Sequence, residues 1–365
     1  MRLLFKRVVI SMLIGVSVSL PLRGQTIATV QEAQQGWQAL QAGDADRADT
    51  IFRQALVSRP NDELLTFGAG AAAHLLGRDD DAERLLKRTL VLNPRLADAA
   101  KWLGDVEYAM GNLDDAIVAY EQALAQKPAD AVLRQRLEAW QREAAIHRGL
   151  TQRNDGRFSI IFEGNADSGL ADRALATLDA AFWRIGGTIG AYPSSSIMVT
   201  LYSERQFRDV TGAPEWADGV FDGKIRIPVQ GARQNLAEFD RVLVHELTHA
   251  MVSSLAPHGV PTWLHEGLAS YFEPRDLASA LRVLRVTGIV PTEVLFDSFT
   301  RLDDRQAAAA YAESLLFADL LMKRAGTHMG IVLQSLERGQ SLQESLELVG
   351  ITLADLTTEI TTPSR

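Results

Sequence analysis

The sequence predicts a multidomain protein in which an all-α repeat solenoid precedes an α+β domain. Small residues and prolines recur every 34 positions between residues 29 and 148. From Asn154, strand-like and helix-like patterns alternate, and the pattern is almost wholly helical from Leu236 onward. A chain of 365 residues is long enough to build two such domains with separate cores.

Residues 1–24 have the pattern of a secretory signal peptide. A basic start precedes an apolar run over residues 8–20, which is shorter than the roughly 20 residues that span a bilayer. The basic residues are Arg2, Lys6 and Arg7. Arg23, beside the expected cleavage point, leaves an uncleaved N-terminal membrane anchor as the alternative. We expect an exported chain, periplasmic or secreted, with no membrane span in its mature form.

Composition narrows the possible partners and ligands. The chain has 37 basic and 46 acidic residues and a net charge of −9, so it lacks the positive charge that nucleic-acid binding requires. Cysteine is absent, so an exported form cannot be stabilised by disulfides or anchored through a lipidated cysteine. Any metal ion must therefore be held by histidines and carboxylates.

The repeated segment has the 34-residue period of tetratricopeptide repeats. The recurring positions are Pro60, Pro94 and Pro128; Gly36, Gly70 and Gly104; Gly43, Gly77 and Gly111; and Ala48, Ala82 and Ala116. The first glycine and the alanine let two antiparallel helices pack closely, the second glycine turns the chain, and the proline ends each unit. We expect three units, followed by a capping helix at about 131–147, within residues 29–148. The units are 29–62, 63–96 and 97–130.

Such a solenoid usually offers a concave surface to a peptide or protein, so we expect a protein partner for the repeats. The alternative is that the repeats serve as a spacer or as a platform packed against the second domain.

The second domain is expected over residues 154–360, with a mixed sheet followed by helices. The predicted strands are 156–162, 197–201 and 224–229, and the predicted helices before the tail are 171–189 and 204–211. Pro228 favours an edge position for the third strand, because proline cannot donate to a neighbouring strand. An extended substrate could then add to the sheet along that strand.

The helical tail opens with a His-Glu-x-x-His motif at residues 245–249. His245 and His249 stand one turn apart on one helix face, so both imidazoles can reach one cation. Glu246 lies beside the first histidine and is placed to take a proton from metal-bound water. Glu266 follows 17 residues after His249 and opens a second helix. Its carboxylate completes a two-histidine, one-glutamate set that leaves a fourth position for water, the catalytic arrangement of Zn²⁺.

The segments His245–His249 (HELTH) and Trp263–Ala269 (WLHEGLA) together resemble the gluzincin metallopeptidases, specifically the bacterial peptidase MA-like group. The resemblance covers most of residues 154–360 and implies a zincin-like metallopeptidase domain. It implies that His245, His249 and Glu266 bind zinc and that Glu246 activates water. The third ligand follows sooner than in thermolysin, a spacing that members of this group share. The implied activity is zinc-dependent hydrolysis of peptide bonds in protein or peptide substrates of the cell envelope.

Four further residues are candidates for a role at this site. The Tyr311 hydroxyl could stabilise the oxyanion of a tetrahedral intermediate, or Tyr311 is an ordinary core or surface tyrosine. Ser314 lies on the same helix face and is a weaker candidate. His265 is not expected to be a ligand, because adjacent residues on a helix point about 100° apart. Glu273 reads as a solvated helix end, with support of a metal ligand as the alternative.

Two other function classes stay open at this point. The chain could be a non-catalytic metal-binding scaffold or assembly factor that recruits proteins through its repeats, or a hydrolase of a substrate other than protein. The intact Glu246 argues against the scaffold, because a general base has no role in a purely structural metal site.

Overall fold

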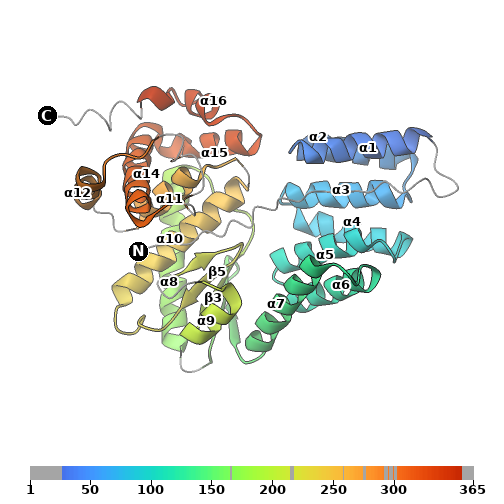
Figure 1. Ribbon diagram of the computed structural model, residues 1–365, viewed down its shortest axis with the longest axis horizontal. Helices are drawn as coiled ribbons and strands as arrows, with labels where there is room; N and C mark the ends of the chain where they lie inside the picture. The colour runs from blue at the N-terminus through green and yellow to red at the C-terminus, as the bar shows by residue number, and fades with distance from the viewer. Residues whose placement is uncertain are drawn as a thin grey trace. The chain divides into compact units, whose positions relative to one another are not determined.

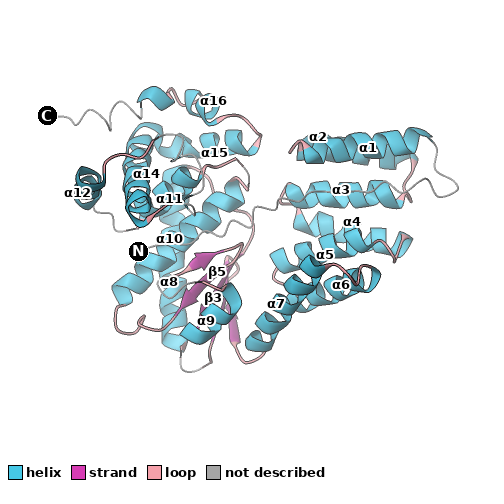
Figure 2. Cartoon of the chain, in the orientation of Figure 1, coloured by secondary structure: helices cyan, strands magenta, loops and turns pink. Residues whose placement is uncertain are grey.

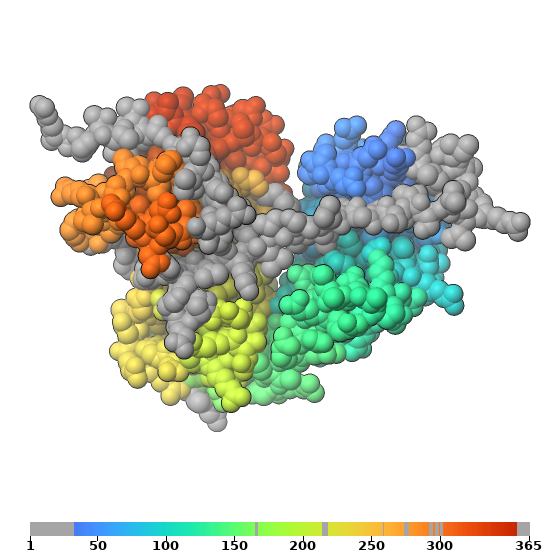
Figure 3. Space-filling view, viewed as in Figure 1, coloured from blue at the N-terminus to red at the C-terminus, as the bar shows by residue number. Residues whose placement is uncertain are grey.

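The computed structural model describes residues 27–164, 167–213, 218–257, 259–273, 277–291, 295, 299 and 302–355. The expected signal peptide and the last residues of the expected second domain lie outside these ranges. The chain divides into two compact units, one ending at Arg148 and the other beginning at Gly149 (Figure 1). Side chains fill the spaces between the ribbons of each unit, as Figure 3 shows for one face.

The N-terminal unit is all-helical, which confirms the predicted repeat solenoid (Figure 2). Its helices are α1 (Ile27–Gln41), α2 (Ala45–Ser58), α3 (Glu63–Leu75), α4 (Asp79–Leu92), α5 (Ala97–Ala109), α6 (Leu113–Gln126) and α7 (Ala131–His147). Helices α1 to α6 form three consecutive pairs, and α7 packs on α6.

The repeated glycines act as the sequence predicts. A side chain at Gly104 on α5 would lie 2.4 Å from the Tyr120 ring on α6, so only glycine lets this buried ring approach the first helix. Gly36 stands in the same relation to the Phe52 ring of the first pair, also at 2.4 Å. Gly111 has a φ of 88°, the left-handed conformation that turns the chain between the helices of the third pair.

The C-terminal unit contains a five-stranded mixed sheet with the strand order β1-β2-β3-β5-β4. The strands are β1 (Thr151–Asn154), β2 (Phe158–Phe162), β3 (Ile197–Tyr202), β4 (Val220–Phe221) and β5 (Ile225–Pro228). The three central strands β2, β3 and β5 are parallel, while β1 and β4 are antiparallel edges.

Two details of this sheet differ from the prediction. The sheet begins at Thr151, before the predicted domain start at Asn154. The sequence does not predict β1, because this polar and largely exposed strand lacks the apolar alternation of an inner strand. The placement of 224–229 at the sheet edge is wrong, since β4 pairs with Ile225 and Arg226. Pro228 is still tolerated there, because β4 is too short to reach it.

Helices surround the sheet and complete the core of this unit. They are α8 (Ser168–Ile189), α9 (Glu204–Thr211), α10 (Leu236–Leu255), α11 (Thr262–Phe272), α12 (Leu277–Thr287), α14 (Asp304–Ala325), η2 (Gly326–His328), α15 (Met329–Glu337) and α16 (Leu342–Glu347). Helix α10 packs against α8, α11, α15 and β5, which makes it the central helix of the unit. Within the described residues, no helix is both long enough and apolar enough to span a membrane.

Candidate metal centre

The first half of the site lies on α10. His245 and His249 are one turn apart and almost fully buried, with 2% and 0% of their surface exposed. The apolar residues around them, such as Leu243 and Leu247, are fully buried in the core of the C-terminal unit. The burial of both flanks holds the helix, and therefore both imidazoles, in one orientation.

The second half of the site comes from α11, which presents the buried Glu266. The next residue, Gly267, explains how α11 is held in place. A side chain at Gly267 would lie 2.3 Å from the backbone oxygen of Ser314, so α14 packs directly on the backbone of α11. Glu266 is thus carried by a helix that is fixed between α10 and α14.

The three side chains point their ligand atoms at one another. The Nε2 atoms of His245 and His249 are 3.1 Å apart, and Glu266 Oε2 is 3.8 Å from each of them. Ligand atoms at 2.0–2.1 Å from a tetrahedral Zn²⁺ lie roughly 3.3 Å from one another, so the triangle fits such an ion with small adjustments. Among the described residues, this is the one cluster of three His, Asp or Glu side chains with ligand atoms this close.

The electrostatics of the cluster also suit a cation. Burial raises the pKa of Glu266 to about 8, and Oε2 of this carboxyl has no hydrogen-bond partner. Burial lowers the pKa of His249 well below its usual value, with the neighbouring His245 and His265 adding to the effect. A neutral imidazole is the form that binds metal. A divalent ion would offset the charge of this buried carboxylate, whose Oε2 has no protein donor.

Glu246 lies beside this triangle and is not part of it. Its side chain is fully buried, and neither carboxylate oxygen has a hydrogen-bond partner. Burial raises its pKa to about 7. Gly219, just before β4, packs against this carboxylate, because a side chain there would lie 3.0 Å from Glu246 Oε1. The edge of the sheet and the free carboxylate are therefore neighbours.

Glu273 is placed differently from our expectation of a solvated helix end. It ends α11 with only 10% of its side chain exposed, forms an ion pair with Arg241, and lies 3.6 Å from His245 Nδ1. Burial alone would raise its pKa, but His245 and Arg241 lower the pKa below its usual value. The sequence signal was its position seven residues after Glu266, which places both carboxylates on one face of α11.

The remaining candidates lie on α14 and α11. Tyr311 is partly buried, and its ring contacts Phe299 edge-on at 5.4 Å. The buried Ser314 hydroxyl donates to Ala310 O at 2.7 Å, which is an ordinary bond within a helix. The His265 ring lies 5.8 Å from the His249 ring but is not part of the cluster of three.

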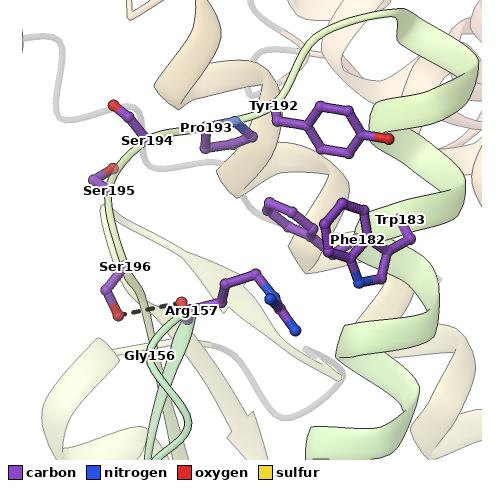
Figure 4. A pocket seen from close by; sticks show the side chains of 9 residues that line it. All are labelled: Gly156, Arg157, Phe182, Trp183, Tyr192, Pro193, Ser194, Ser195 and Ser196. Atoms are coloured by element: carbon purple, nitrogen blue, oxygen red, sulfur yellow. Dashed lines mark hydrogen bonds between the residues drawn. The ribbon is translucent and has the colours of Figure 1, made fainter.

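A separate cavity of about 350 Å³ lies between the ends of β2 and β3 and helix α8 (Figure 4). Its lining is aromatic and hydroxyl-bearing, and the guanidinium of Arg157 lies 5.8 Å from the centre of the Phe182 ring and 5.1 Å from that of the Trp183 ring. None of the three ligand candidates lines it, and it offers no carboxylate or imidazole. The metal centre is therefore a distinct site.

Comparison with known proteins gives matches for both units. Residues 177–362 match the Peptidase MA superfamily, and residues 34–94 and 77–131 match the tetratricopeptide repeat. Comparison with curated proteins gives no match.

The solved structures that resemble part of the chain include the following three. The first TPR of Spaghetti (RPAP3) bound to HSP90 peptide SRMEEVD is 20% identical, with a TM-score of 0.31 over 32% of this chain and 92% of that one. The MamA protein is 24% identical, with a TM-score of 0.31 over 32% of this chain and 64% of that one. The Sgt2 TPR domain from Aspergillus fumigatus is 21% identical, with a TM-score of 0.33 over 36% of this chain and 88% of that one.

Proposed function

Because the chain belongs to the Peptidase MA superfamily, we propose that it is a zinc-dependent peptidase. One observation carries the proposal: the buried triangle of His245, His249 and Glu266 lies beside the unpartnered carboxylate of Glu246. The three residues of the triangle would bind the metal ion, and Glu246 would act as the general base. A structural zinc site would use four protein ligands and would need no such base.

The metal ligands, Glu246 and Tyr311 are each proposed to have one role in peptide hydrolysis. Zinc, when bound by His245, His249 and Glu266, supplies Lewis-acid chemistry that activates water and polarises the substrate carbonyl. Glu246 takes the proton of the attacking water and then passes it to the leaving amine. Its carboxylate is free to do so because no protein donor engages it. Tyr311 is proposed to donate its hydroxyl to the developing oxyanion.

We place the substrate along β4 rather than along β5. β4 is one of the two antiparallel edges of the sheet, and an extended peptide can add to such an edge through main-chain hydrogen bonds. Gly219, which precedes β4, packs against Glu246, so a peptide on this edge would run close to the base. Substitutions in β4 should raise KM for peptides, whereas unchanged KM would refute this placement.

The repeats are proposed to bind a protein partner or the substrate itself, the usual role of this solenoid. The N-terminal pattern of residues 1–24 supports export of the chain to the periplasm or beyond it. Substrates would then be proteins or peptides of the cell envelope.

The first experiment compares the chain from Gln25 onward with its Glu246→Gln and Glu266→Gln variants. Metal content and hydrolysis of an unfolded protein are measured for each. We expect about one zinc per chain in the parent and in Glu246→Gln, with hydrolysis reduced roughly 10²–10⁴-fold in Glu246→Gln. Glu266→Gln should lose both zinc and hydrolysis.

Each of the other outcomes has a defined meaning. Zinc in the parent without hydrolysis would favour the scaffold over the enzyme. A parent that hydrolyses the protein but binds no zinc would refute the metal centre. Equal hydrolysis by the parent and Glu246→Gln would refute the role of Glu246.

A further inference from the structure

The metal centre lies between two helix faces that pair with each other. On α10, Arg241, His245 and His249 follow at intervals of four residues, so they lie on one face. Glu266 on α11 and Glu273, which caps the C-terminal end of α11, are seven residues apart and point to the same side. Glu266 faces His245 and His249, whereas Glu273 faces His245 and Arg241.

The two ring nitrogens of His245 therefore meet different carboxylates. Nε2 lies 3.8 Å from Glu266 Oε2, within the metal triangle, and Nδ1 lies 3.6 Å from Glu273 Oε1. Nδ1 is buried and has no partner within hydrogen-bond distance, and Glu273 Oε1 is the carboxylate oxygen that faces it. A histidine that binds a cation through Nε2 carries its proton on Nδ1, and that proton needs an acceptor.

Arg241 holds the Glu273 carboxylate in a position to accept the Nδ1 proton of His245. Its Nη1 donates to Glu273 Oε2, which leaves Oε1 directed at His245. The rest of the guanidinium is held by Glu238, with Nε at 2.9 and 3.0 Å from the two carboxylate oxygens, and by Asp218 at 3.8 Å. Arg241 is thus anchored on its other side and cannot turn away from Glu273 without losing these contacts.

We propose that Glu273, held by Arg241, is a positioning residue of the metal centre that orients His245 and fixes its tautomer. The inference rests on the proposed function, because it assigns Glu273 a role only if His245 binds a metal ion. Glu273 does not touch substrate or metal. Its effect passes through the Nδ1 proton of His245, which keeps Nε2 directed at Glu266 and His249.

A purely structural ion pair between α10 and α11 would give the same contacts, and metal affinity separates the two roles. The zinc dissociation constant is measured by competition with a chromophoric chelator for the chain from Gln25 onward. Loss of a carboxylate that supports a metal ligand typically weakens metal binding 10–100-fold. We expect Glu273→Ala to weaken zinc binding by about this factor, and Glu273→Gln by less, because its amide oxygen still accepts a hydrogen bond.

Two further variants sharpen the test. Arg241→Met should weaken zinc binding in the same direction, and combining it with Glu273→Ala should add little, because both act through one contact with His245. Asp240→Asn is the matched control. Asp240 lies next to Arg241 on α10 but faces α8, where it forms an ion pair with Arg173, so its substitution should leave zinc affinity unchanged.

Thermal unfolding of the chelator-treated proteins shows whether each variant is folded. The proposal is overturned if folded Glu273→Ala binds zinc as tightly as Asp240→Asn does, since the ion pair is then only structural. It is also overturned if the effects of Glu273→Ala and Arg241→Met simply add. Failure of the parent chain itself to bind zinc would instead overturn the proposed function, and Glu273 would lose its role with it.

Discussion

Gly219 gives the sharpest test of where the base lies. It is buried just before β4, and a methyl group on it would lie 2.8 Å from Val242 Cγ1 and 3.0 Å from Glu246 Oε1. Ordinary contacts between such atoms are about 3.5–4.0 Å, so Gly219→Ala must move β4 or the Glu246 carboxylate by roughly 0.5–1 Å. Val242 lies in the buried core and has little room to yield, so we expect the carboxylate to move.

The size of the effect follows from this displacement. Misplacing a reacting group by about 1 Å can cost roughly 10²-fold in rate, which corresponds to about 2.7 kcal/mol of transition-state stabilisation. We therefore expect kcat/KM for an unfolded protein substrate to fall about 10²-fold in Gly219→Ala. Zinc content should stay at the parent level, because the close contacts of Gly219 are with Val242 and Glu246, not with the three ligands.

Gly169→Ala is the matched control, because a methyl group at Gly169 near the start of α8 would meet no atom within 4 Å. Its kinetics should equal those of the parent. Parent-like kcat/KM in Gly219→Ala would refute the placement of Glu246 as the base beside β4. Loss of zinc in Gly219→Ala would show instead that the substitution disturbs the ligands, and the argument from displacement of the base would fail.

Three more substitutions test other parts of the C-terminal unit. Gly267→Ala should lower the unfolding temperature, because its methyl group would overlap Ser314 O. Overpacking costs about 1–3 kcal/mol, more than the gain of up to about 1 kcal/mol in helix propensity. An unchanged or higher unfolding temperature would contradict the packing of α11 on α14. Burial raises the pKa of Glu313 to about 7 although it accepts the Val290 N–H, so its ionisation costs stability as pH rises from about 4.5 to 7. Glu313→Gln, which cannot ionise, should therefore gain stability relative to the parent by on the order of 3 kcal/mol between pH 5 and pH 8 in urea titrations, and a constant difference would contradict the raised pKa. Tyr311→Phe should lower kcat about 10²–10³-fold at similar KM, and an unchanged kcat would remove Tyr311 from the mechanism.

The solenoid was predictable because its determinants repeat. The same contact, between Gly36 and Phe52 or between Gly104 and Tyr120, recurs 68 residues apart, and each occurrence supports the other. No such repetition exists in the sheet, where each strand must be recognised by its own pattern. β1 is polar and β4 has only two residues, so neither shows the apolar run that marks β2 and β3.

The sequence does not predict β4, and this changes where the edge of the sheet is expected. From the sequence alone, the proline in β5 predicts an edge strand and therefore a substrate along β5. Only the pairing of Phe221 with Ile225 and of Val220 with Arg226 shows that a further strand covers it. A strand this short contributes too few side chains for a pattern, and its position is set by the turn that joins it to β5 rather than by its own sequence.

The same distinction applies within the metal centre. His245, His249 and Glu246 were recognisable because their relation depends only on the geometry of a single helix. The pairing of Glu273 with Arg241 depends on how α11 crosses α10, and that crossing is set by contacts such as Gly267 against Ser314 on a third helix. Sequence spacing places Glu273 on the same face as Glu266, but it does not show that Arg241 and the Nδ1 side of His245 stand opposite that position. The residues that bind were therefore accessible from the sequence, whereas the residue that we propose orients them became visible only with the packing of three helices.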